Sequence, residues 1–366
     1  MVFSPKAPVR IQPYFGHRSR GRLLLSARAL KSGSPNFRKT GGRLQAIRTM
    51  LAQFASREAE GVEVRLEIEL ADGRSESFTR VTDAEGFVHF DVTLDPELAM
   101  PDATMWDVVA LHWTNEDGPQ CVEGHVLAPA ANARLAVISD IDDTIIETGI
   151  TGGFRSIARN WRRVVAQLPE DRIAVPGADA FYGALGGGAV LQDGASSANK
   201  HIPATNRPFF YISSSPWNLY SYLIAFQRAN KLPLGPLKLR DWGFDRATLG
   251  KKGHGAHKSA AIREILAMYP DLRFALIGDD TQGDLPAYGE AVRAYPGRIA
   301  AIFMRKAAGE VLNAEEQTAK ALIEAAGVPM FMGETWEEGQ KFLKAAGVSM
   351  GGETEQIVRR VEGLVE

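Results

Sequence analysis

The sequence predicts two kinds of fold in one chain, an antiparallel β domain followed by a parallel α/β domain. Over residues 62–70, apolar residues alternate with charged or polar ones, which is the period of a half-buried strand. After residue 134, short and mostly apolar stretches alternate with helical ones, which is typical of a parallel sheet covered on both faces. Residues 129–133 have the composition of a linker, so we expect the boundary there.

The β domain is expected over residues 1–130, as a small antiparallel β-sandwich. Its predicted strands are residues 22–29, 62–70, 87–92, 106–113 and 120–128. A helix is expected to interrupt them over residues 44–54, where apolar residues recur at helical spacing beside arginines. Such a basic amphipathic helix either packs on its own domain or lies on a membrane surface.

The α/β domain is expected over residues 131–348, with a charged tail at 349–366. Its predicted strands are residues 135–139, 208–213, 237–240, 273–278, 299–304 and 328–332. Its predicted helices are residues 219–230, 259–268, 314–326 and 335–346. About residues 149–206, between the first acidic strand end and the next strand, we expect a small cap or lid. Its last part, residues 186–206, is rich in Gly, Ser, Ala and Asn and is expected to be a mobile loop or part of that cap.

Composition excludes several classes of protein. The chain has 366 residues, of which 45% are hydrophobic and 23% charged, so wholesale disorder is excluded. The net charge of −2 argues against a nucleic-acid partner. There is no membrane-spanning apolar stretch and no secretory signal in residues 1–20. The single cysteine, Cys121, excludes an intramolecular disulfide and is consistent with a reducing compartment, so we expect a cytoplasmic protein.

The even net charge hides an asymmetric distribution. Residues 1–57 contain twelve Lys or Arg and no acid, whereas residues 58–102 contain thirteen acids and three bases. Either the two segments pair inside the β domain, or the basic segment contacts an anionic surface such as a membrane. A basic, acid-poor start is also typical of a transit peptide, although strand-like sequence begins by Arg22.

Two clusters of carboxylates directly follow apolar strands. They are Asp140, Asp142 and Asp143 after residues 135–139, and Asp279 and Asp284 after residues 273–278. In open α/β sheets, ligand sites form at the carboxyl ends of strands. Acids this close repel one another unless a cation lies among them, and Mg²⁺ prefers oxygen ligands. The alternative interpretation of the first cluster is a solvated acidic turn.

Hydroxyl groups and a lysine lie between the two acidic clusters. Ser213 and Ser214 end an apolar strand, and Pro216 suits the first turn of the helix that follows. These serines either bind a phosphate oxygen at the helix start or cap the helix. Lys258 lies near a predicted helix start, where a cation is unfavourable unless it has a task such as neutralising a phosphate.

In chain order, these pieces read Asp-x-Asp-x-Thr, Ser, Lys and Gly-Asp-x4-Asp. This order resembles the four motifs of the haloacid-dehalogenase-like phosphatases, whose fold is a doubly wound parallel sheet. The runs 139–145, 211–220 and 239–243 look like the catalytic domain of the actin-patch-associated phosphatidate phosphatases, a cousin of the lipin catalytic domain. The similarity covers about residues 131–310. The β domain is similar to the one that precedes this catalytic domain in bacterial relatives.

The resemblance implies the roles of the acids. Asp140 would be the nucleophile that forms an aspartyl-phosphate. Asp142 would protonate the leaving oxygen and then deprotonate the hydrolytic water. Mg²⁺ would be held by Asp140, the backbone carbonyl of Asp142 and Asp279, and by Asp284 either directly or through a water molecule.

The resemblance also implies a phosphate-binding set and a substrate. Ser213, Ser214 and Lys258 would hold the phosphoryl oxygens, and Thr144 would orient the loop. The implied reaction is the hydrolysis of phosphatidate to diacylglycerol, met by peripheral contact with a membrane surface. The alternatives are a phosphatase for a soluble phosphomonoester or a phosphoprotein, and an inert lipid- or protein-binding module, which would be expected to lack Asp140 or Asp142. The sequence makes no prediction of oligomeric state.

Overall fold

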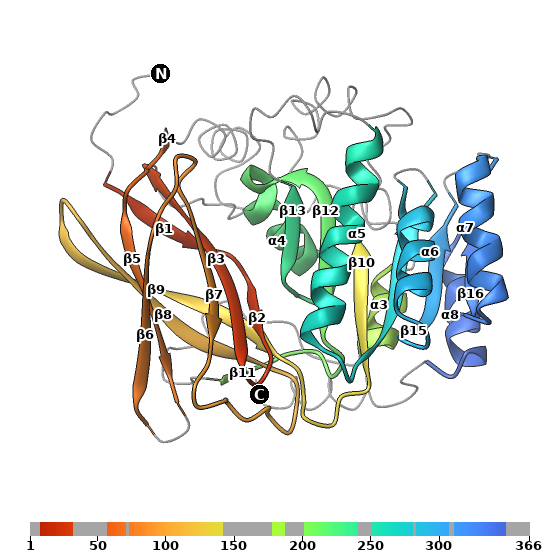
Figure 1. Ribbon diagram of the computed structural model, residues 1–366, viewed down its shortest axis with the longest axis horizontal. Helices are drawn as coiled ribbons and strands as arrows, with labels where there is room; N and C mark the ends of the chain where they lie inside the picture. Colours follow the sequence, from red (N-terminus) through yellow and green to blue (C-terminus); the bar gives the residue numbers. More distant parts are fainter. Residues whose placement is uncertain are drawn as a thin grey trace. The chain divides into compact units, whose positions relative to one another are not determined.

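The computed structural model describes residues 8–31, 57–70, 73–141, 178–186, 201–240, 251–280, 283–306 and 311–348. The chain divides into two compact units, each built around its own sheet (Figure 1). Among the described residues, the first unit comprises those up to Ala131 together with residues 201–203. The second unit comprises the other described residues from Asn132 onward.

The first unit is a ten-stranded sheet whose pairs are antiparallel except for one. Its strands are β1 (Arg10–Pro13), β2 (Gly16–Arg18), β3 (Arg22–Lys31), β4 (Arg57–Glu58), β5 (Glu63–Glu69), β6 (Ser75–Val81), β7 (Phe87–Thr93), β8 (Met105–Asn115), β9 (Gly118–Ala128) and β11 (His201–Pro203). Their order is β1-β3-β2-β9-β8-β5-β6, with β4 and β7 also paired to β3 and β11 paired to β8. The parallel pair is β2 with β9.

All five strands predicted for this unit are present, as β3, β5, β7, β8 and β9. The alternation of apolar and polar residues predicted these strands correctly. Alternate residues of β5, such as Val64 and Leu66, are buried in one core with Leu25 and Phe90. The predicted sandwich differs from the structure in one respect. Hydrogen bonds connect all ten strands into one sheet, because the short strand β2 pairs with β3 on one side and with β9 on the other.

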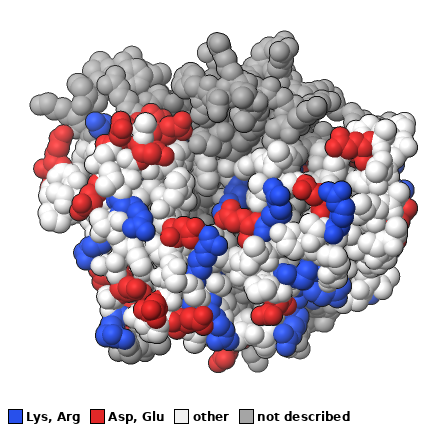
Figure 2. Space-filling model, viewed as in Figure 1, with Lys and Arg blue, Asp and Glu red and all other residues white. Residues whose placement is uncertain are grey.

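Two arginines of the basic segment pair with acids of the acidic segment inside this unit. Arg22 donates from Nε and Nη2 to the two carboxylate oxygens of Asp91, at 2.7 Å each. Arg28 Nη2 lies 3.0 Å from Glu58 Oε1. Internal pairing is therefore confirmed for these arginines, and Figure 2 shows acidic and basic side chains interspersed over the described surface of one face. The helix predicted over 44–54 lies outside the described residues.

The second unit is a six-stranded, wholly parallel sheet with helices. Its strands are β10 (Leu135–Asp140), β12 (Phe209–Pro216), β13 (Leu237–Arg240), β14 (Arg273–Asp279), β15 (Ile299–Arg305) and β16 (Met330–Gly333). Its helices are α3 (Ala178–Gly186), α4 (Tyr220–Ala229), α5 (Lys251–Met268), α6 (Asp284–Ala294), α7 (Ala314–Ala325) and α8 (Trp336–Ala345), with a 3₁₀ turn η3 (Trp217–Leu219). None of the helices in the described ranges is long and apolar enough to span a bilayer.

The strand order β13-β12-β10-β14-β15-β16 reverses at β10. The chain leaves β10 outward through β12 and β13, then returns to β14 on the other side of β10. In open α/β sheets, such a reversal point is where ligands bind, beyond the carboxyl ends of the strands. Helices α5, α6 and α7 contact one another in sequence, and α3 contacts α8 (Figure 1). This layering explains why the central strands β10 and β14 are apolar and buried.

Three elements of this unit differ from the predictions. Helix α5 begins at Lys251 instead of residue 259, because tertiary structure overrides the low helix propensity of Gly253 and Gly255. Helix α6 was not predicted. Helix α3 and strand β11 come from the segment predicted to form a cap, yet α3 packs in the core of the second unit and β11 belongs to the sheet of the first. The rest of residues 149–206 and the tail from residue 349 lie outside the described residues.

Candidate active site

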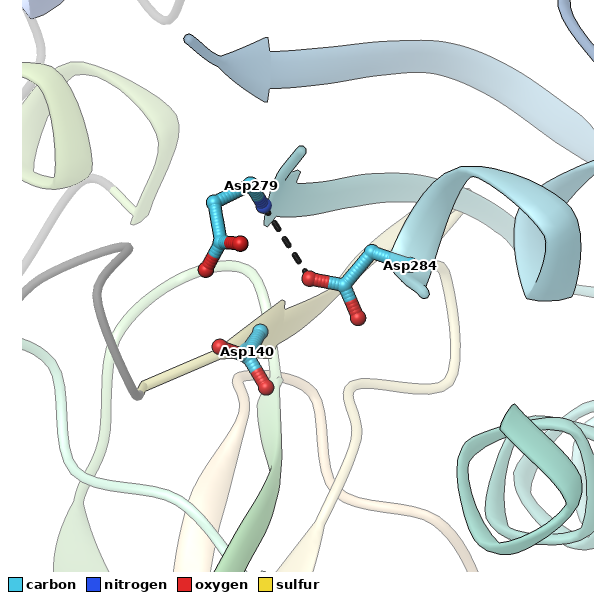
Figure 3. A group of neighbouring side chains, drawn as sticks. All are labelled: Asp140, Asp279 and Asp284. Carbon is cyan, nitrogen blue, oxygen red and sulfur yellow. Dashed lines mark hydrogen bonds between the residues drawn. The ribbon is translucent and has the colours of Figure 1, made fainter. Parts of the chain in front are cut away.

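Three buried aspartates meet at the carboxyl edge of the parallel sheet (Figure 3). Asp140 is the last residue of β10, Asp279 is the last residue of β14, and Asp284 is the first residue of α6. One carboxylate oxygen of each lies within 4.8 Å of the others. The exposed fraction is 2% for Asp140 and 0% for Asp279 and Asp284, so the cluster is not a solvated acidic turn.

The first residue of α6, Asp284, lies against Asp279 at the end of β14. Gly283 precedes the helix with a φ of 79°, a left-handed conformation that glycine adopts without strain. The backbone N–H of Asp279 donates to Asp284 Oδ2 at 3.0 Å, which is the dashed line in Figure 3. A Cβ on Gly278 would lie 2.5 Å from that same oxygen, so the close approach requires glycine. The dipole at the start of α6 also favours the Asp284 carboxylate.

Lys258 of α5 supplies a buried positive charge to this cluster. Its Nζ lies 2.8 Å from Asp140 Oδ1 and also donates to Asp284 Oδ1. Burial by itself lowers the pKa of Lys258, but the carboxylates of Asp140, Asp284 and Asp279 together raise that pKa above its ordinary value. Lys258 is therefore a permanent cation at neutral pH.

The three carboxylates outnumber this ammonium group. When all three are ionised, like charges lie close together in a buried site, where their mutual repulsion is strong. A divalent cation among them would lower this repulsion, and a set of carboxylate oxygens suits a hard ion of the Mg²⁺ type.

Ser213 and Ser214 lie on β12 at the same edge of the sheet, and both are buried. The parallel register places Ile212 opposite Asp140, so the two serines are the next residues along β12. Ser213 Oγ accepts a hydrogen bond from the backbone N–H of Ser215 at 2.9 Å. The N-cap residues of η3 and α4 are Pro216 and Leu219, so neither serine is the N-cap of these helices.

The structure brings together four of the predicted site residues, namely Asp140, Lys258, Asp279 and Asp284. It places Ser213 and Ser214 on the strand beside Asp140. Asp142 and Thr144 lie outside the described residues, and their roles stay predictions. Lys258 is not at a helix start as predicted, because α5 begins seven residues before it, at Lys251.

Two buried tyrosines near the site were not predicted. Tyr182 Oη of α3 lies 2.7 Å from Ser139 Oγ, and that hydroxyl donates to the backbone carbonyl of Asp140 at 2.7 Å. Tyr288 Oη of α6 donates to the carbonyl of Ile277 at 2.7 Å. Burial raises the pKa of both phenols, so they are protonated at neutral pH. The position of Ser139 beside Asp140 could have indicated a role at the site. Tyr182 lies 43 residues further along the chain, and no sequence motif links it to Ser139.

The fold and the site define a parallel α/β domain with an acidic cluster where the strand order reverses. Residues 135–306 match the family model described as phosphatidate phosphatase APP1, catalytic domain. This part of the chain is therefore similar to that catalytic domain, as the sequence motifs predicted.

Two curated relatives show how much of the chain is shared. Over 171 residues, the chain is 31% identical to phosphatidate phosphatase APP1 of Saccharomyces cerevisiae, covering 47% of this chain and 26% of that protein. Over 248 residues, it is 23% identical to an uncharacterized protein of Schizosaccharomyces pombe, covering 67% of this chain and 37% of that protein. The chain therefore spans well under half the length of these relatives.

Similarity to solved structures is weak. A β-glucuronidase of Bifidobacterium dentium aligns with a TM-score of 0.24 and 9% identity, covering 91% of this chain and 61% of that one. A family two carbohydrate esterase of Cellvibrio japonicus aligns with a TM-score of 0.17 and 11% identity, covering 91% and 95%. Scores this low carry no argument about fold or function.

Proposed function

We propose that the second unit is a Mg²⁺-dependent phosphatase of the haloacid-dehalogenase-like type, which hydrolyses phosphatidate to diacylglycerol through an aspartyl-phosphate on Asp140. The observation that carries the proposal is the buried cluster of three carboxylates, paired with Lys258, at the point where the strand order reverses. The substrate class is supported by the family that residues 135–306 match.

The donor set supports Mg²⁺ as the cofactor. Asp140, Asp279 and Asp284 would hold the ion through carboxylate oxygens, and the backbone carbonyl of Asp142 would be a further ligand. When bound, the ion neutralises negative charge on the phosphoryl group and on the nucleophile.

The proposed reaction has two steps at Asp140. First, its carboxylate attacks phosphorus in line and the bond to the leaving oxygen breaks, while Asp142 protonates that oxygen to release diacylglycerol. Second, Asp142 takes a proton from a water molecule, which attacks the aspartyl-phosphate, releases inorganic phosphate and restores Asp140. The contact between Lys258 and Asp140 supports this assignment, because it holds one carboxylate oxygen in a fixed direction.

Lys258 and the two serines form the proposed phosphate-binding set with Thr144. Positioned cations and hydroxyl donors stabilise the charge that develops on the phosphoryl oxygens in the transition state. The buried serines Ser213 and Ser214, one strand away from Asp140, suit this role. A phosphatidate substrate would be met at a membrane surface, by peripheral contact of a cytoplasmic protein.

The test compares wild type with Asp140→Asn and with Asp271→Asn. Asp271 is exposed and precedes the opposite end of β14 from Asp279, so it is a matched control for losing one carboxylate. Phosphate release is measured from phosphatidate in mixed micelles and from p-nitrophenyl phosphate, with Mg²⁺ or with EDTA.

We expect Mg²⁺-dependent release from phosphatidate by wild type and Asp271→Asn, and none above background by Asp140→Asn. Phosphate release from p-nitrophenyl phosphate alone would refute phosphatidate as the substrate, and it would leave the proposed phosphatase mechanism in place. Release that persists in Asp140→Asn would refute the nucleophile. Release from neither substrate by wild type would count against the enzyme and favour a binding module.

A further inference from the structure

Ser139 and Asp140 are consecutive residues of β10, so their side chains point to opposite faces of the sheet. Asp140 faces α5, where it contacts Lys258. Ser139 faces α3, where its hydroxyl contacts Tyr182. Helix α3 thus lies on the face of β10 opposite to the Asp140 side chain, and none of its residues has a role in the proposed mechanism.

The hydrogen bonds behind Asp140 run in one direction. A serine hydroxyl has a single hydrogen, and that of Ser139 is donated to the carbonyl oxygen of Asp140 at 2.7 Å. The contact of 2.7 Å between Ser139 Oγ and Tyr182 Oη therefore has the phenol as its donor. The relay runs from Tyr182 through Ser139 to the main chain of Asp140.

The aromatic ring of Tyr182 is fixed by packing. It is fully buried, with its centroid 6.0 Å from that of Phe209 and 6.2 Å from that of Trp336. The neighbouring Phe181 packs against Trp336 at 4.5 Å and against Phe303 of β15 at 5.0 Å. Helix α3 is thereby anchored to the sheet, and the phenol has a fixed position behind β10.

We propose that Tyr182 and Ser139 are positioning residues for the nucleophile, because they fix the carbonyl of Asp140 and with it the peptide that joins Asp140 to Ile141. The carbonyl and the following amide lie in one plane, so a held carbonyl sets the direction in which the chain leaves the strand. The inference rests on the proposed function, which assigns the nucleophile to Asp140. Displacement of a reacting group by about 1 Å lowers a rate by roughly 10²-fold.

The test is a double-mutant cycle on the full chain, with Tyr182→Phe, Ser139→Ala and the double variant. Tyr211→Phe is the matched control. Tyr211 is equally buried in the same sheet, and its hydroxyl donates to the carbonyl of Pro233 at 2.7 Å, outside the relay. Each variant is checked for folding by its melting temperature, and kcat and KM are measured on the substrate that wild type hydrolyses.

We expect Tyr182→Phe to lower kcat by roughly tenfold with little change in KM, because misplacement affects the chemical step more than binding. The double variant should be no slower than Ser139→Ala, because Tyr182 acts only through Ser139. Tyr211→Phe should keep the kcat of wild type. Additive losses, or equal kcat values for Tyr182→Phe and Tyr211→Phe, would overturn the inference. If Ser139→Ala fails to fold, the kcat values of Tyr182→Phe and Tyr211→Phe are compared alone, and equal values overturn the inference.

A second readout separates this inference from the proposed function. Mn²⁺ affinity, measured by electron paramagnetic resonance, should fall severalfold in Tyr182→Phe and stay unchanged in Tyr211→Phe. If wild type hydrolyses neither substrate but this difference in affinity is seen, the proposed function fails, and Tyr182 is shown to position Asp140 as a metal ligand only. If wild type is inactive and the two variants bind Mn²⁺ equally, both fail. An active wild type whose two variants agree in kcat and in affinity overturns the positioning role alone.

Discussion

Lys258 Nζ lies 2.8 Å from Oδ1 of Asp140, and both side chains are buried. The same ammonium group donates to Asp284, so one cation joins the proposed nucleophile to a proposed metal ligand. An ammonium group has three donors, and one of them is donated to Asp284. We expect another to meet a phosphoryl oxygen of the substrate.

The first prediction concerns the loss of this charge. Lys258→Met should abolish detectable phosphatase activity and lower the free energy of unfolding of the metal-free protein by about 3–5 kcal/mol, because it leaves buried carboxylates without their cation. Mg²⁺ should stabilise this variant more than it stabilises wild type. Urea unfolding with and without Mg²⁺ measures both effects.

Lys238→Met is the control, since Lys238 forms a partly exposed ion pair with Glu264 at 2.7 Å. Its removal should change the free energy of unfolding by less than about 1 kcal/mol. Equal losses in the two variants would contradict a special role of the charge at residue 258.

The second prediction concerns pH. An ordinary lysine titrates near pH 10.4, and the carboxylates around Lys258 raise its pKa above that value despite the opposing effect of burial. Its stabilising contribution is therefore complete below the unfolded-state pKa, and is lost only as the pH rises through the higher folded-state value. Deprotonation of Lys258 should thus not limit kcat up to about pH 9. An alkaline fall of kcat that disappears in Lys258→Arg would contradict this.

The third prediction concerns Gly278, the residue of β14 that directly precedes Asp279. Gly278→Ala would place a Cβ 2.5 Å from Asp284 Oδ2 and 2.6 Å from Tyr288 Oη. We expect a loss of about 1–3 kcal/mol in the free energy of unfolding, as in other overpacked sites, and a clear loss of Mg²⁺ affinity because Asp284 is displaced.

Gly183→Ala, inside α3, is the matched control, because its Cβ would meet nothing within 4 Å. It should be neutral or stabilise the protein by up to about 1 kcal/mol, through helix propensity. Calorimetry measures both variants, and an unaltered Mg²⁺ affinity in Gly278→Ala would show that the approach of Asp284 does not depend on glycine.

Much of the parallel sheet was predictable from sequence, because its central strands are buried on both faces. The runs 135–139 and 273–278 are mostly apolar for this reason. The acidic side chains that follow them are therefore easy to recognise in the sequence. Asp140, Asp279 and Asp284 were found from this contrast and meet in the structure. The assignment of Asp140 as the nucleophile came from the family resemblance, because the sequence pattern does not distinguish one aspartate from another.

The remaining features depend on packing between distant segments. Strand β2 has three residues, too few to show a period, yet it joins the first sheet into one. Helix α3 lies in a segment whose composition suggested a lid, and only the fold brings Tyr182 to Ser139. The start of α5 was missed because Gly253 and Gly255 disfavour a helix locally.

The last prediction concerns the first unit, where a buried and an exposed arginine can be compared. Arg18 Nε lies 2.5 Å from Asp107 Oδ2 with both side chains buried, whereas the pair of Arg22 with Asp91 is about half exposed. Arg18→Met should lower the free energy of unfolding by about 3–5 kcal/mol, because it strands the Asp107 carboxylate in the interior. Arg22→Met should lower it by less than about 1 kcal/mol, since solvent screens the exposed pair.

Hydrogen exchange followed by mass spectrometry measures these effects for each unit separately, through peptides that cover β8 and β10. Arg18→Met should raise exchange in β8, which carries Asp107. Arg18→Met combined with Asp107→Leu should recover much of the loss, because replacing both partners of a buried pair by apolar groups is often neutral or stabilising. Comparable exchange in the two single arginine variants, or no recovery in the double variant, would show that the Arg18 pair stabilises this sheet no more than a surface contact does.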